Sequence, residues 1–285
     1  MKTVFLILNY KTYNETIQLI DELLSEELND RLILIVDNGS PNESYKILTN
    51  RYIGSEKVEV ISTGKNIGYA KGNNYGLRYA KKYNPQYVCI INNDVHFSLA
   101  LIDKLECVYS SIENVALLSP VQHLLDGKPA VFSNLKKIPS FYQDLKMTLG
   151  ISSVVKHIYC PDNTYKNLQK VEIVPGAFLF ISYPLFENIG FFFEGTFLFC
   201  EERFTAKKIR DQGLCSYILL DEYYIHAHSL TINKEKSNRS QLNLLFKGRL
   251  LYTKYYRKYS NAKICMLYIA YGLGNVLRFI KRFVR

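Results

Sequence analysis

The chain has 285 residues, of which 48% are apolar, so it is long enough for one large domain or two small ones with a sizeable core. Its net charge of +10 is uneven: residues 236–285 hold twelve Lys or Arg and no acidic residue, which leaves 24 basic and 26 acidic residues before them. This near-neutral body argues against a nucleic-acid-binding protein. Six cysteines without paired metal-ligand spacing argue against a zinc module and are typical of a reducing compartment.

Strand and helix patterns alternate through the first 120 residues. We expect apolar strands at 4–8, 32–36, 58–62, 87–93 and 115–118, with helices between them. Thr12 and Glu15 fit a capping box for the first helix, and Ser40, Pro41 and Glu43 fit the Ncap, N1 and N3 positions of the second. Such alternation predicts a parallel sheet with helices on both faces.

Polar residues follow three of these strands, at Asp37 and Asn38, at 66–74, and at 92–94. The carboxyl ends of parallel strands share one edge of a sheet, where ligands collect, so the pattern indicates a nucleotide site. Asp94 offers a hard oxygen ligand for Mg²⁺ or Mn²⁺, or else it only turns the chain. No G-x-G-x-x-G follows the first strand and no P-loop is present; Gly64, Gly68 and Gly72 follow the third strand instead, and they allow the backbone to approach a phosphate.

The second half of the chain carries two further groups of candidate residues. After an irregular stretch at 122–170 and ordered residues at 171–182, the acidic pair Glu201-Glu202 follows an aromatic run. The pair marks either the N-terminus of a helix ending near Gly213 or a catalytic base. A strand at 214–220 then precedes His226 and His228, a possible metal-binding pair.

In order along the chain, these strings resemble the family-2 inverting glycosyltransferases of GT-A fold, especially the rhamnosyltransferase-like and capsular or O-antigen polysaccharide branch. The resemblance covers residues 2–234. It rests on Asn9-Tyr10, on 36–40 (V-D-N-x-S), on 66–74 (N-x-G-[FY]-[AG]-x-G-N-N), on 92–94, on 175–177, on 193–202 and on 226–231. Asn93 stands where the family has Pro, Glu202 stands where it has Asp, and Phe204 falls where the family continues D-L.

The resemblance implies a Rossmann-like, mostly parallel sheet with helices on both faces, and a hexosyltransferase activity. The donor is expected to be a UDP- or dTDP-linked sugar and the acceptor a growing, lipid-linked surface glycan. Asp94 and His226 are the implied ligands of Mn²⁺ or Mg²⁺. Glu202 is the implied general base, with Glu201 as the alternative. The implied contacts with the nucleotide-sugar are Asn9, Tyr10, Asp37, Asn38, Asn66, Gly68, Lys71, Asn73, Asn74, Asn92, Gly176 and Ala177.

We expect a glycosyltransferase domain at 1–235, with a nucleotide-binding half at about 1–120 and an acceptor-binding half at about 121–235, followed by a basic helical segment at 236–285. The apolar stretch 264–277 is about fourteen residues, too short to span a bilayer but able to lie in its interface. We therefore expect a cytoplasmic protein held on the inner face of the membrane, unless these amphipathic helices only pack on the catalytic domain. A sugar nucleotidyltransferase is the alternative function, and a nucleic-acid-binding protein a weaker one.

Overall fold

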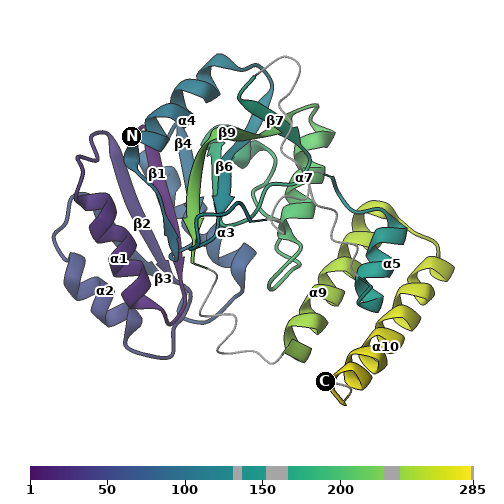
Figure 1. The fold of residues 1–285 in the computed structure, drawn as a ribbon. Helices are drawn as coiled ribbons and strands as arrows, with labels where there is room; N and C mark the ends of the chain where they lie inside the picture. Colours follow the sequence, from purple (N-terminus) through teal and green to yellow (C-terminus); the bar gives the residue numbers. More distant parts are fainter. Residues whose placement is uncertain (131–136, 152–165, 228–237, 284–285) are drawn as a thin grey trace.

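The computed structural model describes residues 1–130, 137–151, 166–227 and 238–283, and its centre is one sheet of nine strands (Figure 1). The strand order is β3-β2-β1-β4-β8-β6-β9-β5, and β7 pairs with β9. The strands are β1 (Thr3–Asn9), β2 (Arg31–Asp37), β3 (Val58–Ser62), β4 (Tyr87–Ile91), β5 (Val95–His96), β6 (Val115–His123), β7 (Leu168–Val171), β8 (Phe178–Ser182) and β9 (Cys215–His226).

Helices cover both faces of this sheet, as the sequence predicts. The helices in the described ranges are α1 (Tyr13–Leu24), α2 (Ser44–Tyr52), α3 (Tyr69–Ala80), η1 (Lys81–Tyr83), α4 (Leu99–Ser111), α5 (Phe141–Leu149), α6 (Tyr183–Asn188), α7 (Glu201–Asp211), α9 (Asn238–Tyr252), η2 (Thr253–Arg257) and α10 (Asn261–Phe283). Core residues of α1, α2 and α4 pack on one face, and those of α3, α6 and α7 on the other. Gly76 lets α3 approach closely, because a Cβ there would lie 2.5 Å from Leu6.

The strands β3, β2, β1 and β4 are parallel, and their register aligns their carboxyl ends. Asn9 pairs with Asp37, and Asp37 pairs with Ser62. These strands are rich in Val, Ile and Leu because both faces are covered, and β1, β2 and β4 are almost wholly buried. The polar residues that end them therefore meet at one edge of the sheet.

The second half of the sheet is mixed, and its last strand is longer than the sequence pattern indicates. β8 runs antiparallel to β4 and to β6, and β9 runs parallel to β6. We expected a strand ending at Leu220, but β9 continues to His226 because Tyr224 is fully buried and packs against Phe178 at 5.2 Å between ring centroids. This extension places His226 opposite Val95 of β5.

Two expected helix caps were wrong. The hydroxyl of Thr12 accepts a hydrogen bond from Asn93 Nδ2 (2.7 Å), and in the described part of the chain it makes no capping bond to α1. Ser40 donates its hydroxyl to Asp37 (2.7 Å), and α2 starts only at Ser44. Both side chains serve the sheet edge rather than a helix end.

The C-terminal helices pack on the rest of the protein through α7 and α5 (Figure 1). Gly248 of α9 lies against Cys200, where a Cβ would come 3.0 Å from the Cys200 side chain, and the ring of Phe204 meets that of Tyr252 at 5.2 Å. α10 in turn packs on α5. The division at residue 235 stays a prediction, since α9 directly contacts the helix that carries Glu202.

Candidate active site

The first candidate cluster joins the ends of β1 and β2. Asp37 is 1% exposed and accepts hydrogen bonds from Asn9 Nδ2 (2.7 Å), from Ser40 Oγ (2.7 Å) and from the Ser40 backbone (2.9 Å). Ser40 also accepts from the backbone N–H of Lys11 (2.8 Å). Asp37 thus fixes the loop that carries Tyr10, which is half-buried with the Lys11 ammonium 5.2 Å from its ring centroid.

Asn38 organises the loop between β3 and α3. Its Oδ1 accepts from the backbone of Ile67 (3.2 Å), and its Nδ2 donates to Asn66 Oδ1 and to the Gly68 carbonyl (both 3.3 Å). Gly68 has φ +90° and precedes α3; a Cβ there would lie 2.5 Å from the carbonyl oxygen of Phe197. Only glycine fits this position, because that φ is left-handed and the Phe197 backbone leaves no room.

The three candidate residues in α3 are an exposed cation and two buried amides. Lys71 is exposed. Asn73 is 1% exposed and donates to the Tyr69 carbonyl (3.0 Å). Asn74, also 1% exposed, exchanges hydrogen bonds with the backbone of Phe192 (2.9 and 3.0 Å) and donates to Glu194 (2.9 Å). The structure therefore uses Asn74 to hold the 192–194 loop against α3.

The candidate metal ligands Asp94 and His226 lie together. His226 Nε2 is 3.1 Å from Asp94 Oδ1, and both side chains are nearly buried. His226 Nδ1 lies 3.1 Å from Gln122 Nε2, and Gln122 Oε1 accepts from the hydroxyl of Tyr224 (3.0 Å). This chain of contacts fixes the orientation of the imidazole ring. Among the described residues no group of three His, Cys, Asp or Glu side chains could hold a metal, and His228 lies outside those residues.

Asn93 connects this pair to the first cluster. Its Nδ2 donates to the hydroxyl of Thr16 (2.9 Å), which donates to Asn9 Oδ1 (2.9 Å). A continuous path of hydrogen bonds thus runs from Asp37 through Asn9 and Thr16 to the residue before Asp94. A proline at position 93 would lack this amide.

Gly176 and Ala177 bring the acidic pair to the same edge. The backbone N–H of Asn92 donates to the Ala177 carbonyl (3.0 Å), and the hydroxyl of Tyr69 donates to the Gly176 carbonyl (2.8 Å). A Cβ on Gly176 would lie 3.2 Å from Glu202 Oε1, so glycine makes room for the carboxylate. Asn92 also lies 3.5 Å from His226. The strand ends, the acidic pair and the histidine are therefore linked by contacts along one edge of the sheet.

The two glutamates at the start of α7 differ in environment. Glu201 is 5% exposed and its Oε2 has no hydrogen-bond partner among the described residues, whereas Glu202 is only half-buried. Burial raises the pKa of Glu202, and burial together with the neighbouring Glu202 carboxylate raises that of Glu201 well above its ordinary range. The two residues before the pair have left-handed backbone conformations, with φ +73° at Phe199 and φ +69° at Cys200. Such strain is found at functional sites.

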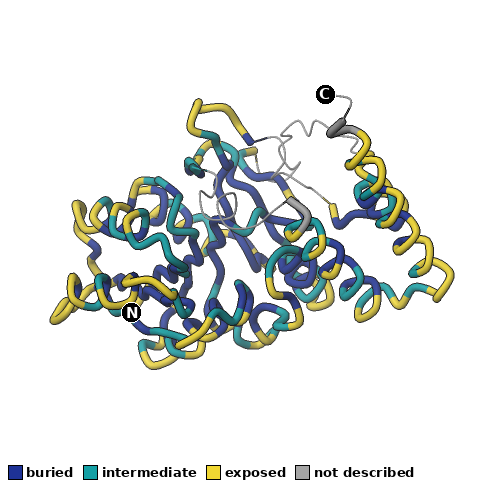
Figure 2. Tube along the Cα trace, turned by 90° about the horizontal axis from the view of Figure 1, so that it is seen from below, coloured by how far each residue is buried: buried dark blue, intermediate teal, exposed yellow. Residues whose placement is uncertain are grey.

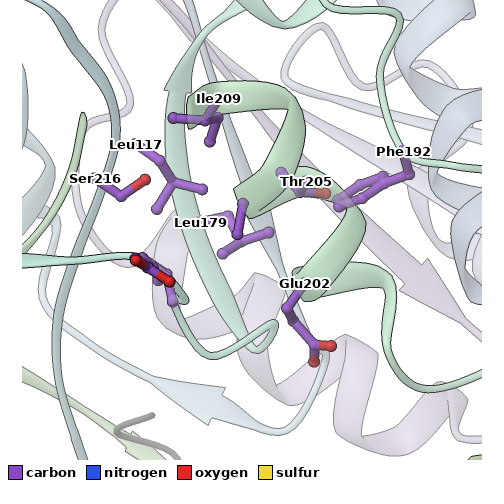
Figure 3. Close-up of a pocket in the computed structure, with 10 residues that line it drawn as sticks. Leu117, Leu179, Phe192, Glu202, Thr205, Ile209 and Ser216 are labelled. Atoms are coloured by element: carbon purple, nitrogen blue, oxygen red, sulfur yellow. The ribbon is translucent and has the colours of Figure 1, made fainter. Parts of the chain in front are cut away.

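A small apolar cavity lies behind the pair, with a volume of about 10 Å³, close to the least that holds one water. Figure 3 shows Glu202 at its edge, with the carboxylate directed away from Leu117, Leu179 and Ile209. The cavity is too small for a nucleotide, so the carboxylate and not the cavity marks the site.

The sequence did not predict a role for three side chains near these residues: Gln122, Thr16 and the hydroxyl of Tyr69, which acts as a hydrogen-bond donor. Gln122 sits on β6, whose expected end at Leu118 put it in an irregular region, but β6 continues to His123. Thr16 lies in the stretch expected to be the first helix and was not singled out. The run of β-formers Tyr223-Tyr224-Ile225 was the available sequence signal for the longer β9.

Comparison with known proteins bears on the family and the fold. Residues 5–115 match the family described as Glycosyl transferase family 2. The chain is 27% identical over 198 residues to the low-salt glycan biosynthesis hexosyltransferase Agl10 of Haloferax volcanii, covering 69% of this chain and 58% of that protein. It is 23% identical over 219 residues to the dTDP-rhamnosyl transferase RfbF of Shigella flexneri, covering 76% of this chain and 67% of that one. This chain thus spans only about three fifths of the length of Agl10.

Among solved structures, GalNAc-T7 with UDP, GalNAc and Mn²⁺ is similar over 89% of this chain and 48% of that one, with a TM-score of 0.64 and 13% identity. At that identity the likeness shows the fold alone. The match over residues 5–115 covers less than half of the chain and makes that part similar to glycosyltransferase family 2, while the architecture of the sheet is that of the GT-A fold.

Proposed function

We propose that this protein transfers a sugar from a nucleotide-sugar to an acceptor hydroxyl, with inversion at the anomeric carbon. One observation carries the proposal: the Glu202 carboxylate faces Gly176, whose neighbour Ala177 is hydrogen-bonded to Asn92, two residues before Asp94. A proton-accepting carboxylate and a pair suited to a diphosphate-bound cation therefore lie on one sheet edge. Inverting transfer needs both, because the acceptor loses a proton as the diphosphate leaves.

Glu202 is the better candidate for the base. It is half-buried beside Gly176, whereas Glu201 is buried and one of its oxygens lacks a hydrogen-bond partner in the described part of the chain. Burial raises the pKa of Glu202, which brings it nearer to the working pH and makes it a stronger proton acceptor. The neighbouring Arg203 guanidinium offsets part of this rise in the pKa of Glu202.

Asp94 and His226 suit a divalent cation. One carboxylate and one imidazole, 3.1 Å apart, are a small donor set, and Mg²⁺ or Mn²⁺ in such sites takes its remaining ligands from substrate phosphates and water. A bound cation would neutralise charge on the leaving diphosphate. Asp37, Asn38 and Asn66 hold the loops that would surround the base and ribose.

For the substrates, we propose a UDP- or dTDP-linked hexose as donor and a lipid-linked surface glycan, of the capsular or O-antigen kind, as acceptor. The names of the two curated relatives support this choice, since one is a glycan biosynthesis hexosyltransferase and the other a dTDP-rhamnosyl transferase. The basic, apolar C-terminal helices support an acceptor held at a membrane.

The test compares Glu202→Gln with Glu201→Gln. A thermal-shift panel of nucleotide-sugars with and without Mn²⁺ first identifies the donor, because a ligand that binds the folded state raises the midpoint. Glu202→Gln should then keep donor binding and lose about 10²- to 10⁴-fold in donor turnover. Equal loss in Glu201→Gln alone would move the base by one residue, and no loss in either would remove the pair from catalysis.

Asp94→Ala tests the metal in the same assay. We expect the Mn²⁺-dependent part of the thermal shift to disappear, while the melting point without ligand stays near that of the unmodified protein. A variant that still needs Mn²⁺ and turns over at the normal rate would place the ligand elsewhere.

A further inference from the structure

One face of α10 packs against the protein. Leu267, Ala270 and Gly274 are buried, and the ring of Tyr271 stacks on Phe246 of α9 at 4.1 Å between centroids. Arg278 donates to the carbonyl of Thr148, the next-to-last residue of α5 (3.3 and 3.4 Å). In Figure 1, α10 lies at the outer edge of the molecule, with α5 between it and α9.

The other face of α10 is also apolar, yet it is exposed. Of nineteen exposed large apolar side chains among the described residues, eight lie between positions 266 and 280 of this one helix, and Figure 2 shows much of α10 as exposed. They are Met266 (44%), Tyr268 (56%), Ile269 (57%), Leu273 (54%), Val276 (55%), Leu277 (43%), Phe279 (61%) and Ile280 (50%). Positions 266, 269, 273, 276 and 280 follow helical spacing, so they form one stripe. We call these eight side chains the outer face.

Basic residues flank the stretch of sequence that holds most of the outer face, and no charged residue lies within that stretch. No Lys, Arg, Asp or Glu occurs from Ile264 to Leu277, whereas Lys263 precedes the stretch and Arg278, Lys281, Arg282 and Arg285 follow it. The whole segment 236–285 carries twelve basic and no acidic residues. An apolar helix face bounded by cations is complementary to a bilayer with anionic headgroups. Pairing of two copies through this face would instead bring two strongly basic segments together.

We propose that the outer face of α10 docks on the surface of an anionic lipid bilayer, with the helix lying in the plane of the interface. The eight outer-face side chains enter the headgroup and acyl boundary. The positive charge of the basic residues that flank the stretch attracts the anionic lipid headgroups. On this proposal, the membrane is the partner that covers the exposed apolar surface.

The contacts of α10 favour this in-plane position over a spanning one. By length and composition, α10 is the one helix in the described ranges that could cross a membrane, with 20 residues of mean hydropathy 1.3. It is thus a longer apolar helix than the fourteen-residue run expected from the sequence. However, its inner face packs on α5 and α9. α5 has only 9 residues and carries Asp144, and α9 has 15 residues and carries Arg249. Crossing would strip these contacts from Tyr271 and Arg278.

Docking through α10 would also orient the proposed active site. Asp144 of α5 forms a buried ion pair with Arg203 (2.7 Å), the residue after Glu202 in α7. The helix on the membrane and the helix with the candidate base are thus joined through α5. The proposal does not depend on the proposed reaction, because binding to lipid is measured without donor or acceptor.

The experiment is vesicle co-sedimentation of the full chain on phosphatidylcholine alone and on phosphatidylcholine with phosphatidylglycerol, at low and high salt. Ile269→Glu/Leu273→Glu removes the centre of the outer face. Ile53→Glu/Leu125→Glu is the matched control, because these side chains are 79% and 71% exposed and lie outside α10. The chain has no tryptophan, so Phe279→Trp adds a single fluorescent reporter on the outer face.

We expect the unmodified protein and the control to bind anionic vesicles at low salt and to be partly released by high salt. Ile269→Glu/Leu273→Glu should bind at least about tenfold more weakly with an unchanged circular dichroism spectrum, and the indole emission of the Phe279→Trp variant should shift to the blue on binding. Equal binding by the two double variants, or none by the unmodified protein, would overturn the proposal. A lipid-free dimer that only the α10 variant dissociates would assign the face to a second copy. Retention on vesicles after carbonate washing would overturn the in-plane position.

Discussion

The buried ion pair between α5 and α7 makes a quantitative prediction about stability. Asp144 is 3% exposed, and two arginines share it: Arg203 at 2.7 Å and Arg249 at 3.8 Å. Burial, and then the neighbouring Arg203 guanidinium, lowers the pKa of Arg249, which is the mark of two buried cations around one carboxylate. Asp144→Asn keeps the shape of the side chain and removes its charge. Both guanidinium groups then stay buried without the carboxylate that they share.

Breaking a buried pair in this way costs about 3–5 kcal/mol, a large part of the roughly 5–15 kcal/mol that stabilises a typical domain. The matched control is Asp103→Asn. Asp103 also pairs with a buried arginine, Arg31, but it is 69% exposed, and Arg31 keeps Glu106 at 3.2 Å. The control should therefore lose less than about 1 kcal/mol.

Urea unfolding followed by circular dichroism gives both free energies by linear extrapolation. Asp144→Asn should unfold at a clearly lower urea concentration than Asp103→Asn. If the two variants agree within about 1 kcal/mol, the burial of the Asp144 cluster does not govern its energy, and the reasoning fails.

Three further predictions concern the site. Burial and Glu202 raise the pKa of Glu201, so the folded state holds that proton more tightly, and stability falls as pH rises from the unfolded pKa through the folded one. Glu201→Gln should remove this loss, so within that pH window its free energy of unfolding should rise relative to that of the unmodified protein by about 1.4 kcal/mol per pH unit. Urea unfolding at several pH values measures both free energies, and parallel curves of stability against pH would refute the prediction. Gly68→Ala should lower the free energy of unfolding by at least about 1 kcal/mol more than Gly54→Ala. Both glycines have positive φ, but no described atom lies within 4 Å of a Cβ at Gly54, whereas a Cβ at Gly68 meets the backbone of Phe197. Equal losses in the two variants would show that the Phe197 contact does not contribute. Gln122→Leu should weaken Mn²⁺ binding about 10- to 100-fold, measured by electron paramagnetic resonance of free Mn²⁺, and unchanged affinity would show that Gln122 does not orient His226.

The sequence predicts the fold of the first 120 residues well because local signals and tertiary structure agree there. Strands buried on both faces are continuous apolar runs, and each run ends at a polar cluster, so Asp37 and Asn92 could be placed on one edge. α7 was also expected almost as found, since an acidic pair starts it and Gly213 follows it at φ +71°.

The remaining features depend on contacts between distant residues. Thr12 and Ser40 look like caps locally, but Asn93 and Asp37 compete for them. Gly72, which we associated with phosphate, lies where a Cβ would come 2.7 Å from Leu8, so its smallness serves the packing of α3 on β1. Asn74 matches a nucleotide-site string, yet its amide holds the 192–194 loop. No local pattern distinguishes these uses.

The aromatic cluster over α7 has a consequence for synthesis. The ring of Phe204 stacks on Phe193 at 4.2 Å between centroids, and Tyr252 and Tyr256 close over it at 5.2 and 5.3 Å. Because the ribosome makes the chain from its N-terminus, the sheet emerges while Phe204 is still uncovered. The helix that carries Glu202 therefore acquires its complete packing only after η2 has left the exit tunnel, and a nascent chain stalled before Tyr252 exposes an apolar aromatic surface to chaperones.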